Sequence, residues 1–298
     1  MKILLLGKNG QLGWELQRSL APLGELVALG RTDTPLAADF DDPQGLAAIV
    51  RELRPQMIVN AAAYTAVDKA ESELEPARGV NAVAPGMLAR EAAAMGAWLV
   101  HYSTDYVFNG SGRLPWNEDA PTAPLNVYGR TKLEGEQLIR ASGCRHLILR
   151  TSWVYAARGG NFAKTMLRLA SERERLTVID DQFGAPTGAD LLADVTAHAL
   201  RTALQRPDVS GTYHAVAGGE TSWHGYARLV VEWARAHGMP IKVAAEAVEA
   251  IPTSAFPTPA ERPRNSRLDT TRLRETFGLT LPHWRAGVER MLAEVHDR

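Results

Sequence analysis

Two residues in the segment 125–139, LNVYGRTKLEGEQLI, are of types that can perform proton chemistry together. Tyr128 and Lys132 are four positions apart, a spacing that puts two side chains on the same face of an α-helix. A phenol, with an ordinary pKa of about 10, is a weak acid at neutral pH, and a nearby cation lowers that pKa. The pair therefore indicates a general acid for a carbonyl oxygen that receives a hydride at its carbon, although a YxxxK pair alone occurs often by chance.

A third residue is expected beside this pair. The segment 101–108, HYSTDYVF, contains the end of an apolar run, so we predict a strand that ends near Ser103 and presents the Thr104 hydroxyl at the edge of a sheet. There Thr104 can hydrogen-bond the substrate oxygen and hold it near the phenol. General acid catalysis of this kind typically accelerates a reaction by about 10²–10⁴-fold.

The glycines of GKNGQLG, residues 7–13, indicate a nucleotide site. Gly7, Gly10 and Gly13 lie between a predicted strand and a helix with an apolar face. Glycines at such a turn let the backbone approach a pyrophosphate, whose charge is favoured by the helix N-terminus. The GxxGxxG spacing is the form seen in the short-chain dehydrogenase/reductase superfamily.

Cofactor type should be decided at the end of the second strand, where an acidic residue would accept a hydrogen bond from the adenosine ribose 2′-hydroxyl. This chain has Gly30 there, followed by Arg31. A guanidinium can pair with a 2′-phosphate, so we expect NADPH to be accepted and preferred, with NADH as a second cofactor. The alternative is that Arg31 is a solvated loop residue. Nearby, Asp39 and Phe40 are placed to flank an adenine ring, and the small residues 61–63 let backbone run close to a dinucleotide.

Two more residues are candidates for substrate contact. Trp153, just past a predicted strand end, can wall in a sugar or can pack in the core. Arg262 lies near the end of the Pro-rich stretch 251–263, which we interpret as an ordered loop or lid. It can clamp a diphosphate or can belong to a solvated loop.

These residues need a fold that brings strand ends together. Short apolar runs alternate with amphipathic segments over the first half of the chain, which predicts βαβ units, a parallel sheet and a doubly wound, Rossmann-like α/β fold. The predicted strands are Lys2–Leu6, Leu26–Leu29, Met57–Ala61, Trp98–Ser103 and His146–Ser152, and the predicted helices are Gln11–Ala21, Pro43–Leu53, one around Glu75–Met95, and Val127–Ala141. We predict a dinucleotide-binding domain over residues 1–155, with returning segments from about 188–218. Residues 156–187 and 219–298 should mainly form a smaller, interleaved substrate-binding lobe.

Composition narrows the class of protein. The chain has 298 residues, of which 45% are hydrophobic and 22% charged, and a formal net charge of −1, so nothing favours a nucleic-acid or membrane partner. Cys144 is the single cysteine, which excludes an intramolecular disulfide and favours the cytoplasm. No apolar run approaches the roughly 18–20 residues of a membrane span.

Eight segments in order carry a resemblance over essentially the whole chain. They are GKNGQLG, VNAAAYTAVDKAE, HYSTDYVF, PLNVYGRTKLEGE, RTSWVYA, GNFAKTML, DQFGAPTGA and RPRNSRLDT. With them the sequence closely resembles the dTDP-4-dehydrorhamnose reductases, a family of extended short-chain dehydrogenases. The resemblance implies reduction of the 4-keto group of dTDP-4-dehydro-L-rhamnose to dTDP-L-rhamnose for cell-envelope polysaccharide.

The resemblance also implies roles for individual residues. Tyr128 would be the proton donor, Lys132 the partner that lowers its pKa, and Thr104 the third catalytic residue. Thr104, Asp105 and Trp153 would contact the nucleotide-sugar substrate, to which the residue-based prediction adds Arg262. Together with the residue-based predictions, the cofactor-binding set comprises Gly7, Gly10, Gln11, Leu12, Gly13, Arg31, Asp39, Phe40, Ala61, Ala62, Ala63, Tyr64, Thr65, Tyr102, Tyr128 and Lys132.

Two points of the family pattern stay open. Many members carry an acidic residue where this chain has Gly30, which puts strict NADH use in doubt. Some members hold a divalent ion such as Mg²⁺ between subunits through glutamates; Glu15, Asp190 and Glu289 are candidates, but their spacing does not indicate a metal site. A homodimer is common in similar proteins, and the sequence leaves the oligomeric state open.

Three alternatives remain. A sugar-nucleotide 4,6-dehydratase typically needs an Asp-Glu pair after the threonine, whereas this chain has Asp105 and Tyr106, so reduction is favoured. An epimerase retains its cofactor, and the sequence does not separate it from a reductase. A non-catalytic regulatory subunit of methionine adenosyltransferase also resembles this family, but an intact Thr104, Tyr128 and Lys132 argue against that role.

Overall fold

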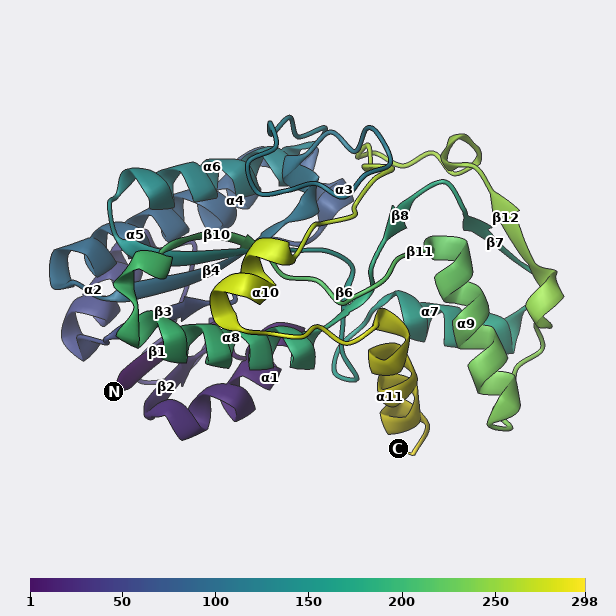
Figure 1. The fold of residues 1–298 in the computed structure, drawn as a ribbon, viewed down its shortest axis with the longest axis horizontal. Coiled ribbons are helices and arrows are strands. Elements are labelled where there is room, and N and C mark those ends of the chain that lie inside the picture. The colour runs from purple at the N-terminus through teal and green to yellow at the C-terminus, as the bar shows by residue number, and fades with distance from the viewer. Residues whose placement is uncertain (298) are drawn as a thin grey trace.

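The central feature of the computed structural model, which describes residues 1–297, is a six-stranded parallel sheet in the order β10-β5-β4-β3-β1-β2. Helices cover both of its faces (Figure 1). The order reverses direction next to β1, and ligands of such open sheets bind beyond the carboxyl ends of the strands near that point. The predicted doubly wound α/β fold is confirmed.

The elements of the sheet and its covering helices alternate along the chain. The strands are β1 (Lys2–Leu6), β2 (Glu25–Leu29), β3 (Met57–Asn60), β4 (Trp98–Thr104), β5 (Arg145–Thr151) and β10 (Gly211–His214). The helices are α1 (Gln11–Leu20), α2 (Pro43–Leu53), α3 (Val67–Ala70), α4 (Leu74–Arg78), α5 (Ala84–Met95), α6 (Val127–Ala141), α8 (Ala189–Gln205) and α10 (Thr271–Phe277). All five predicted strands are present within one residue at each end, and α2 and α6 have the predicted bounds.

The apolar side chains of each strand alternate between two cores. Ile3 and Leu5 of β1 pack with α1, α8 and α10, while Leu4 and Leu6 pack with α2, α5 and α6. This division follows from the two-residue period of a strand that is buried on both faces. Helix α6, which carries Tyr128 and Lys132, is thereby fixed beside β4.

The predicted helix around Glu75–Met95 is not one regular helix. It consists of α4, a π-helical segment, Gly79–Val83, and α5. Within that segment Asn81 donates to the Tyr64 carbonyl at 3.1 Å and to the Thr131 hydroxyl of α6 at 3.2 Å. A π-bulge re-aims side chains locally, and here it directs the Asn81 amide onto the loop that follows β3.

A smaller lobe lies at the right of Figure 1, beyond the carboxyl edge of the sheet. Its elements are β6 (Val154–Tyr155), α7 (Phe162–Glu172), β7 (Leu176–Ile179), β8 (Phe183–Gly184), β9 (Thr187–Gly188), β11 (Thr221–Ser222), α9 (Trp223–Ala236), β12 (Val248–Ile251) and α11 (Trp284–His296). A separate apolar core joins α7, α9, α11, β7 and β12. The chain crosses between the two cores several times, since α8, β10 and α10 return to the sheet.

Candidate active site

The residues with catalytic potential meet at the carboxyl edge of β4. Thr104, the last residue of β4, accepts a hydrogen bond from the Tyr106 amide at 3.1 Å and donates to Asp105 Oδ1 at 3.1 Å. Both Thr104 and Asp105 are buried. The strand therefore ends where the sequence predicts, with the Thr104 hydroxyl fixed by its own turn.

Helix α6 begins beside this turn because its first residues fit closely against it. The Asn126 side chain caps the helix by accepting from the Gly129 amide at 2.8 Å. At position 129 a Cβ would collide with the Tyr106 carbonyl oxygen, so only glycine permits this approach. The fit brings Tyr128 next to Thr104, and the Tyr128 ring meets that of Tyr106 edge to face at 5.6 Å.

Lys132 is buried one helical turn after Tyr128. Its Nζ donates to the Tyr102 carbonyl at 2.5 Å and lies 3.2 Å from His101 Nε2. Burial lowers the pKa of Lys132 to about 8, an effect that the charge of Glu136 opposes. The amine is thus tied to β4, the strand that ends in Thr104.

The pKa of Tyr128 differs from the prediction. Burial, the largest effect, and the charge of Asp105 raise it to about 12, although the Thr104 hydroxyl acts to lower it. A lowering by Lys132 is not seen, because that amine is directed at the Tyr102 carbonyl and because removal of the phenol from water dominates. The phenol therefore stays fully protonated at neutral pH, the state required of a proton donor.

Asp105 lies close to both hydroxyls. Burial raises its pKa to about 7, while hydrogen bonds with Ser266 and Thr104 lower it. In the unfolded chain an aspartate titrates near pH 3.9. Because the folded-state pKa is the higher of the two, the stabilising effect of the protonated form is complete below about pH 4 and is lost as the pH rises towards 7.

We expect Asp105→Asn, which keeps the shape and removes the charge, to become progressively more stable than the original chain as the pH rises from 5 to 8. Urea unfolding at pH 5, 6, 7 and 8 measures the difference in unfolding free energy. A difference that does not vary with pH would contradict the raised pKa of Asp105.

The glycine turn has the geometry that a dinucleotide needs. Gly7 has φ of +86°, and a Cβ at this position would lie 2.7 Å from the Ala62 amide nitrogen. Gly13 lies directly under Gly7, and Gly10 precedes the first residue of α1 without any side-chain cap. The Gln11 side-chain oxygen is buried and has no hydrogen-bond partner within the protein. Free amides and this oxygen fit a pyrophosphate and the sugar or amide groups next to it.

A cavity of about 340 Å³ borders this turn and contains many of the predicted cofactor residues. It is lined by Gly7, Gly10, Arg31, Ala38, Asp39, Phe40, Asp41, Ala61, Ala62, Ala63, Tyr64 and Val80. Arg31 lies on this rim with an exposed side chain that pairs with Asp39 at 3.3 Å and with Asp41 at 2.5 Å. Tyr102 is placed differently, because its hydroxyl contacts Thr196 of α8 at 2.7 Å in the core.

A larger cavity of about 610 Å³ lies between the lobes. Its lining includes Asp68, Tyr106, Phe162, Trp223, Phe256 and Arg262. The mixture of aromatic, apolar and charged side chains is suited to a ligand that has a ring at one end and an anionic group. Sequence reasoning did not identify Asp68, Phe162 or Trp223, which come from three distant segments.

Arg262 is not a free cation in this cavity. Its guanidinium donates to both Asp68 oxygens, at 2.8 and 2.7 Å, and the Ala260 amide donates to the same carboxylate at 3.2 Å. The Asn126 amide also donates to the Glu261 carbonyl at 2.7 Å. The loop that carries Arg262 is therefore fastened to α3 and to the beginning of α6.

Trp153 packs against another aromatic residue. Its indole stacks on Trp223 with ring centroids 3.6 Å apart, and its φ of 50° is uncommon for a bulky side chain. The stack joins the end of β5 to α9 of the smaller lobe. Trp153 itself is partly exposed beside the cavity that Trp223 lines.

The candidate metal ligands do not form a metal centre. No group of three or more His, Cys, Asp or Glu side chains with suitable placement occurs within residues 1–297. Each candidate faces an arginine instead: Glu15 faces Arg18 at 3.7 Å, Asp190 faces Arg290 at 3.4 Å and Glu289 faces Arg285 at 2.9 Å. The structure therefore does not support a metal at these residues.

The parallel sheet, the glycine turn and the Thr-Tyr-Lys group define an extended short-chain dehydrogenase/reductase. The family described as "RmlD substrate binding domain" matches residues 1–297. The dTDP-4-dehydrorhamnose reductase of Escherichia coli (strain K12) is 59% identical over 295 residues, covering 99% of this chain and 98% of that protein. The chain belongs to the dTDP-4-dehydrorhamnose reductase family.

Further similar proteins support this family membership. The dTDP-4-dehydrorhamnose reductase of Burkholderia thailandensis is 50% identical over 97% of both chains. A solved dTDP-4-dehydrorhamnose reductase from Bacillus anthracis, in complex with NADP, is 35% identical with a TM-score of 0.86, over 98% of this chain and 99% of the other. A dTDP-glucose 4,6-dehydratase from Streptomyces venezuelae, at 18% identity and a TM-score of 0.81, shares the fold. Within residues 1–297 no helix is both long and apolar enough to cross a membrane.

Proposed function

We propose that this protein is an oxidoreductase that reduces the 4-keto group of dTDP-4-dehydro-L-rhamnose to give dTDP-L-rhamnose, with NADPH or NADH as reductant. The observation that carries the proposal is the meeting of Thr104, Tyr128 and buried Lys132 at the carboxyl edge of the sheet, the edge at which the glycine turn also lies. The 59% identity to a reductase of that name supports the substrate.

The mechanism assigns one task to each residue. A bound reduced nicotinamide supplies the hydride. The Thr104 hydroxyl hydrogen-bonds the ketone oxygen and orients it towards Tyr128, whose phenol donates its proton as negative charge develops on that oxygen. Lys132, fixed to the Tyr102 carbonyl, ties α6 to β4 and so holds Tyr128 beside Thr104. Burial keeps the phenol protonated until the ketone arrives.

The dinucleotide would occupy the cavity beside the glycine turn. The free amides at Gly10 and along the start of α1 suit its pyrophosphate, and Phe40 with the small residues 61–63 suit the adenosine. Arg31 on the rim would favour NADPH over NADH to the extent that a 2′-phosphate draws it away from Asp39 and Asp41. A comparison of kcat/KM for the two cofactors checks this preference, and a strong preference for NADH would contradict it.

The larger cavity would hold the nucleotide part of the substrate. Arg262 is the expected diphosphate contact, and Asp68 holds its guanidinium in place. We expect Arg262→Met to raise KM for the sugar nucleotide about tenfold or more with a smaller effect on kcat, because a charged hydrogen bond contributes about 1.5–3 kcal/mol. Arg264→Met, whose exposed guanidinium lies 3.9 Å from Asp181, is the control and should leave KM nearly unchanged. Equal KM values for both variants would contradict the assignment.

The decisive experiment offers dTDP-4-dehydrorhamnose together with NADPH and follows the absorbance of the reduced nicotinamide. A reductase consumes one NADPH for each sugar converted. Conversion of the sugar without net consumption would indicate an epimerase. No conversion, combined with tight cofactor binding, would favour the regulatory-subunit alternative.

We propose a dinucleotide-binding domain over residues 1–155 that is completed by segments from about 188–218, with a substrate-binding lobe formed mainly by 156–187 and 219–298. We also propose a cytoplasmic location and a homodimer. Sedimentation or light scattering of the purified chain tests the dimer.

A further inference from the structure

A carboxylate lies at the end of β2 although the residue expected to supply it is a glycine. Asp33, three residues after Gly30, folds back so that its Oδ2 accepts a hydrogen bond from the Gly30 amide at 2.8 Å. A Cβ built on Gly30 would lie 3.3 Å from Asp33 Oδ1 and 2.6 Å from the Asn9 side-chain nitrogen. Asp33 and Asn9 therefore fill the space that a side chain at position 30 would enter.

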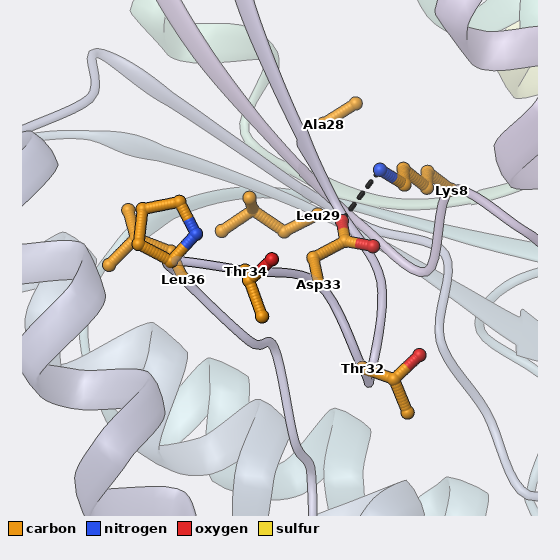
Figure 2. A pocket seen from close by; sticks show the side chains of 8 residues that line it. Lys8, Ala28, Leu29, Thr32, Asp33, Thr34 and Leu36 are labelled. Carbon is orange, nitrogen blue, oxygen red and sulfur yellow. Dashed lines mark ion pairs between the residues drawn. The ribbon is translucent and has the colours of Figure 1, made fainter.

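Lys8 of the glycine turn neutralises this carboxylate. Its Nζ lies 2.6 Å from Asp33 Oδ2, as the dashed line in Figure 2 marks. The Lys8 hydrogen bond and the Gly30 amide together hold the pKa of Asp33 below its ordinary value. The two side chains are 28% and 23% exposed, so solvent and a ligand can reach both partners.

The pair borders a second hollow next to the dinucleotide cavity. This hollow, of about 480 Å³, is lined by Lys8, Ala28, Leu29, Thr32, Asp33, Thr34, Pro35 and Leu36 (Figure 2). Neighbouring residues line the two spaces: Gly7 and Arg31 line the dinucleotide cavity, and Lys8 and Thr32 line the hollow. A group that extends past the end of β2 from the adenosine side would thus meet the Lys8–Asp33 pair.

We infer that the Lys8–Asp33 pair is the subsite for the 2′-position of the adenosine ribose and sets the ratio of NADPH to NADH binding. This inference rests on the dinucleotide site of the proposed function. Asp33 can accept a hydrogen bond from a 2′-hydroxyl but repels a 2′-phosphate. Lys8 attracts a 2′-phosphate once its amine leaves Asp33. The two side chains therefore have opposite effects on the preference for NADPH over NADH. Arg31 is less available for this task because Asp39 and Asp41 already pair with it.

The test measures binding without any sugar substrate. Calorimetric titrations with adenosine 2′,5′-bisphosphate and with AMP are made on the full chain, on Asp33→Asn and on Lys8→Met. Asp33→Asn retains an oxygen for the Gly30 amide and should increase the preference for the bisphosphate over AMP about tenfold. Lys8→Met should decrease the same preference about tenfold. The ratio of dissociation constants for NADPH and NADH should move in the same directions.

Matched controls come from the opposite end of the same two strands. Lys2 and Glu25 form an exposed ion pair at 3.8 Å between β1 and β2, so Lys2→Met and Glu25→Gln change the net charge equally without touching the subsite. Both controls should leave the preference unchanged. The inference would be overturned, with the dinucleotide site left intact, if the preference for the bisphosphate over AMP were the same in Asp33→Asn, in Lys8→Met and in the controls. A change of this preference in Arg31→Met alone would also overturn the inference. If the original chain bound neither nucleotide, the dinucleotide site itself would be refuted.

Discussion

Tyr128→Phe should lower kcat for reduction of the sugar ketone by about 10²–10⁴-fold, the usual contribution of a positioned general acid. Phenylalanine keeps the ring that meets Tyr106 edge to face, so the packing of α6 is preserved while the transferable proton is lost. Cofactor binding should change little. Steady-state kinetics and a fluorescence titration with NADPH measure the two effects separately.

Tyr213→Phe provides the matched control for this change. Tyr213 is a buried tyrosine of β10, two strands away from β4, and its hydroxyl donates to the Val209 carbonyl at 2.7 Å. Its replacement should cost some stability and leave kcat nearly unchanged. Normal turnover by Tyr128→Phe would remove the phenol from the mechanism and favour a scaffold role for the protein.

Glu136→Gln should reduce the free energy of unfolding by about 3–5 kcal/mol, as expected when one partner of a buried ion pair is removed. Glu136 lies one turn after Lys132 on α6, and both of its oxygens accept from Arg150 of β5, at 2.9 and 2.7 Å. The Glu136 and Arg150 side chains are 0% and 3% exposed, so the variant would leave Arg150 buried without a counter-charge. Urea unfolding measures the loss.

Glu134→Gln on the same helix is the comparison. Glu134 pairs with Arg78 at 2.7 Å, but these side chains are 33% and 43% exposed, and such pairs contribute about 1 kcal/mol or less. If both variants lost the same small amount of stability, the Glu136–Arg150 pair would not be the contact that fastens α6 to the sheet.

The sheet could be predicted from sequence because its signals are local. Each buried strand is a short apolar run, and Asp42 with Pro43 marks the beginning of α2 at the residue where the structure has it. The π-helical segment Gly79–Val83 and the return of α10 to the sheet were not predicted. Both depend on distant partners, since Asn81 binds Thr131 of α6 and Leu273 packs in the sheet core.

The candidate site likewise combines features that the sequence predicts with contacts that depend on distant partners. The positions of Thr104, Tyr128 and the glycine turn follow from one rule, that parallel strands end at a common edge. The partner of Lys132 could not be inferred, because its contact with the Tyr102 carbonyl requires the depth of α6 against β4. The Asp68–Arg262 pair joins residues 194 positions apart, and Asp33 reaches Gly30 only through the path of a loop. No periodicity in the sequence encodes such contacts.

The repeated crossing of the chain between its two cores affects how the protein can be synthesised and cut. A fragment that stops after Tyr155 would lack β10, leaving β5 as an open edge, and would lack α8 and α10, which cover Leu147 and Leu149. Exposed strand edges and bare apolar faces promote aggregation. A nascent chain therefore cannot complete the cover of this face until about residue 277 has left the ribosome. Gene shuffling that exchanges one lobe as a contiguous cassette should yield insoluble products.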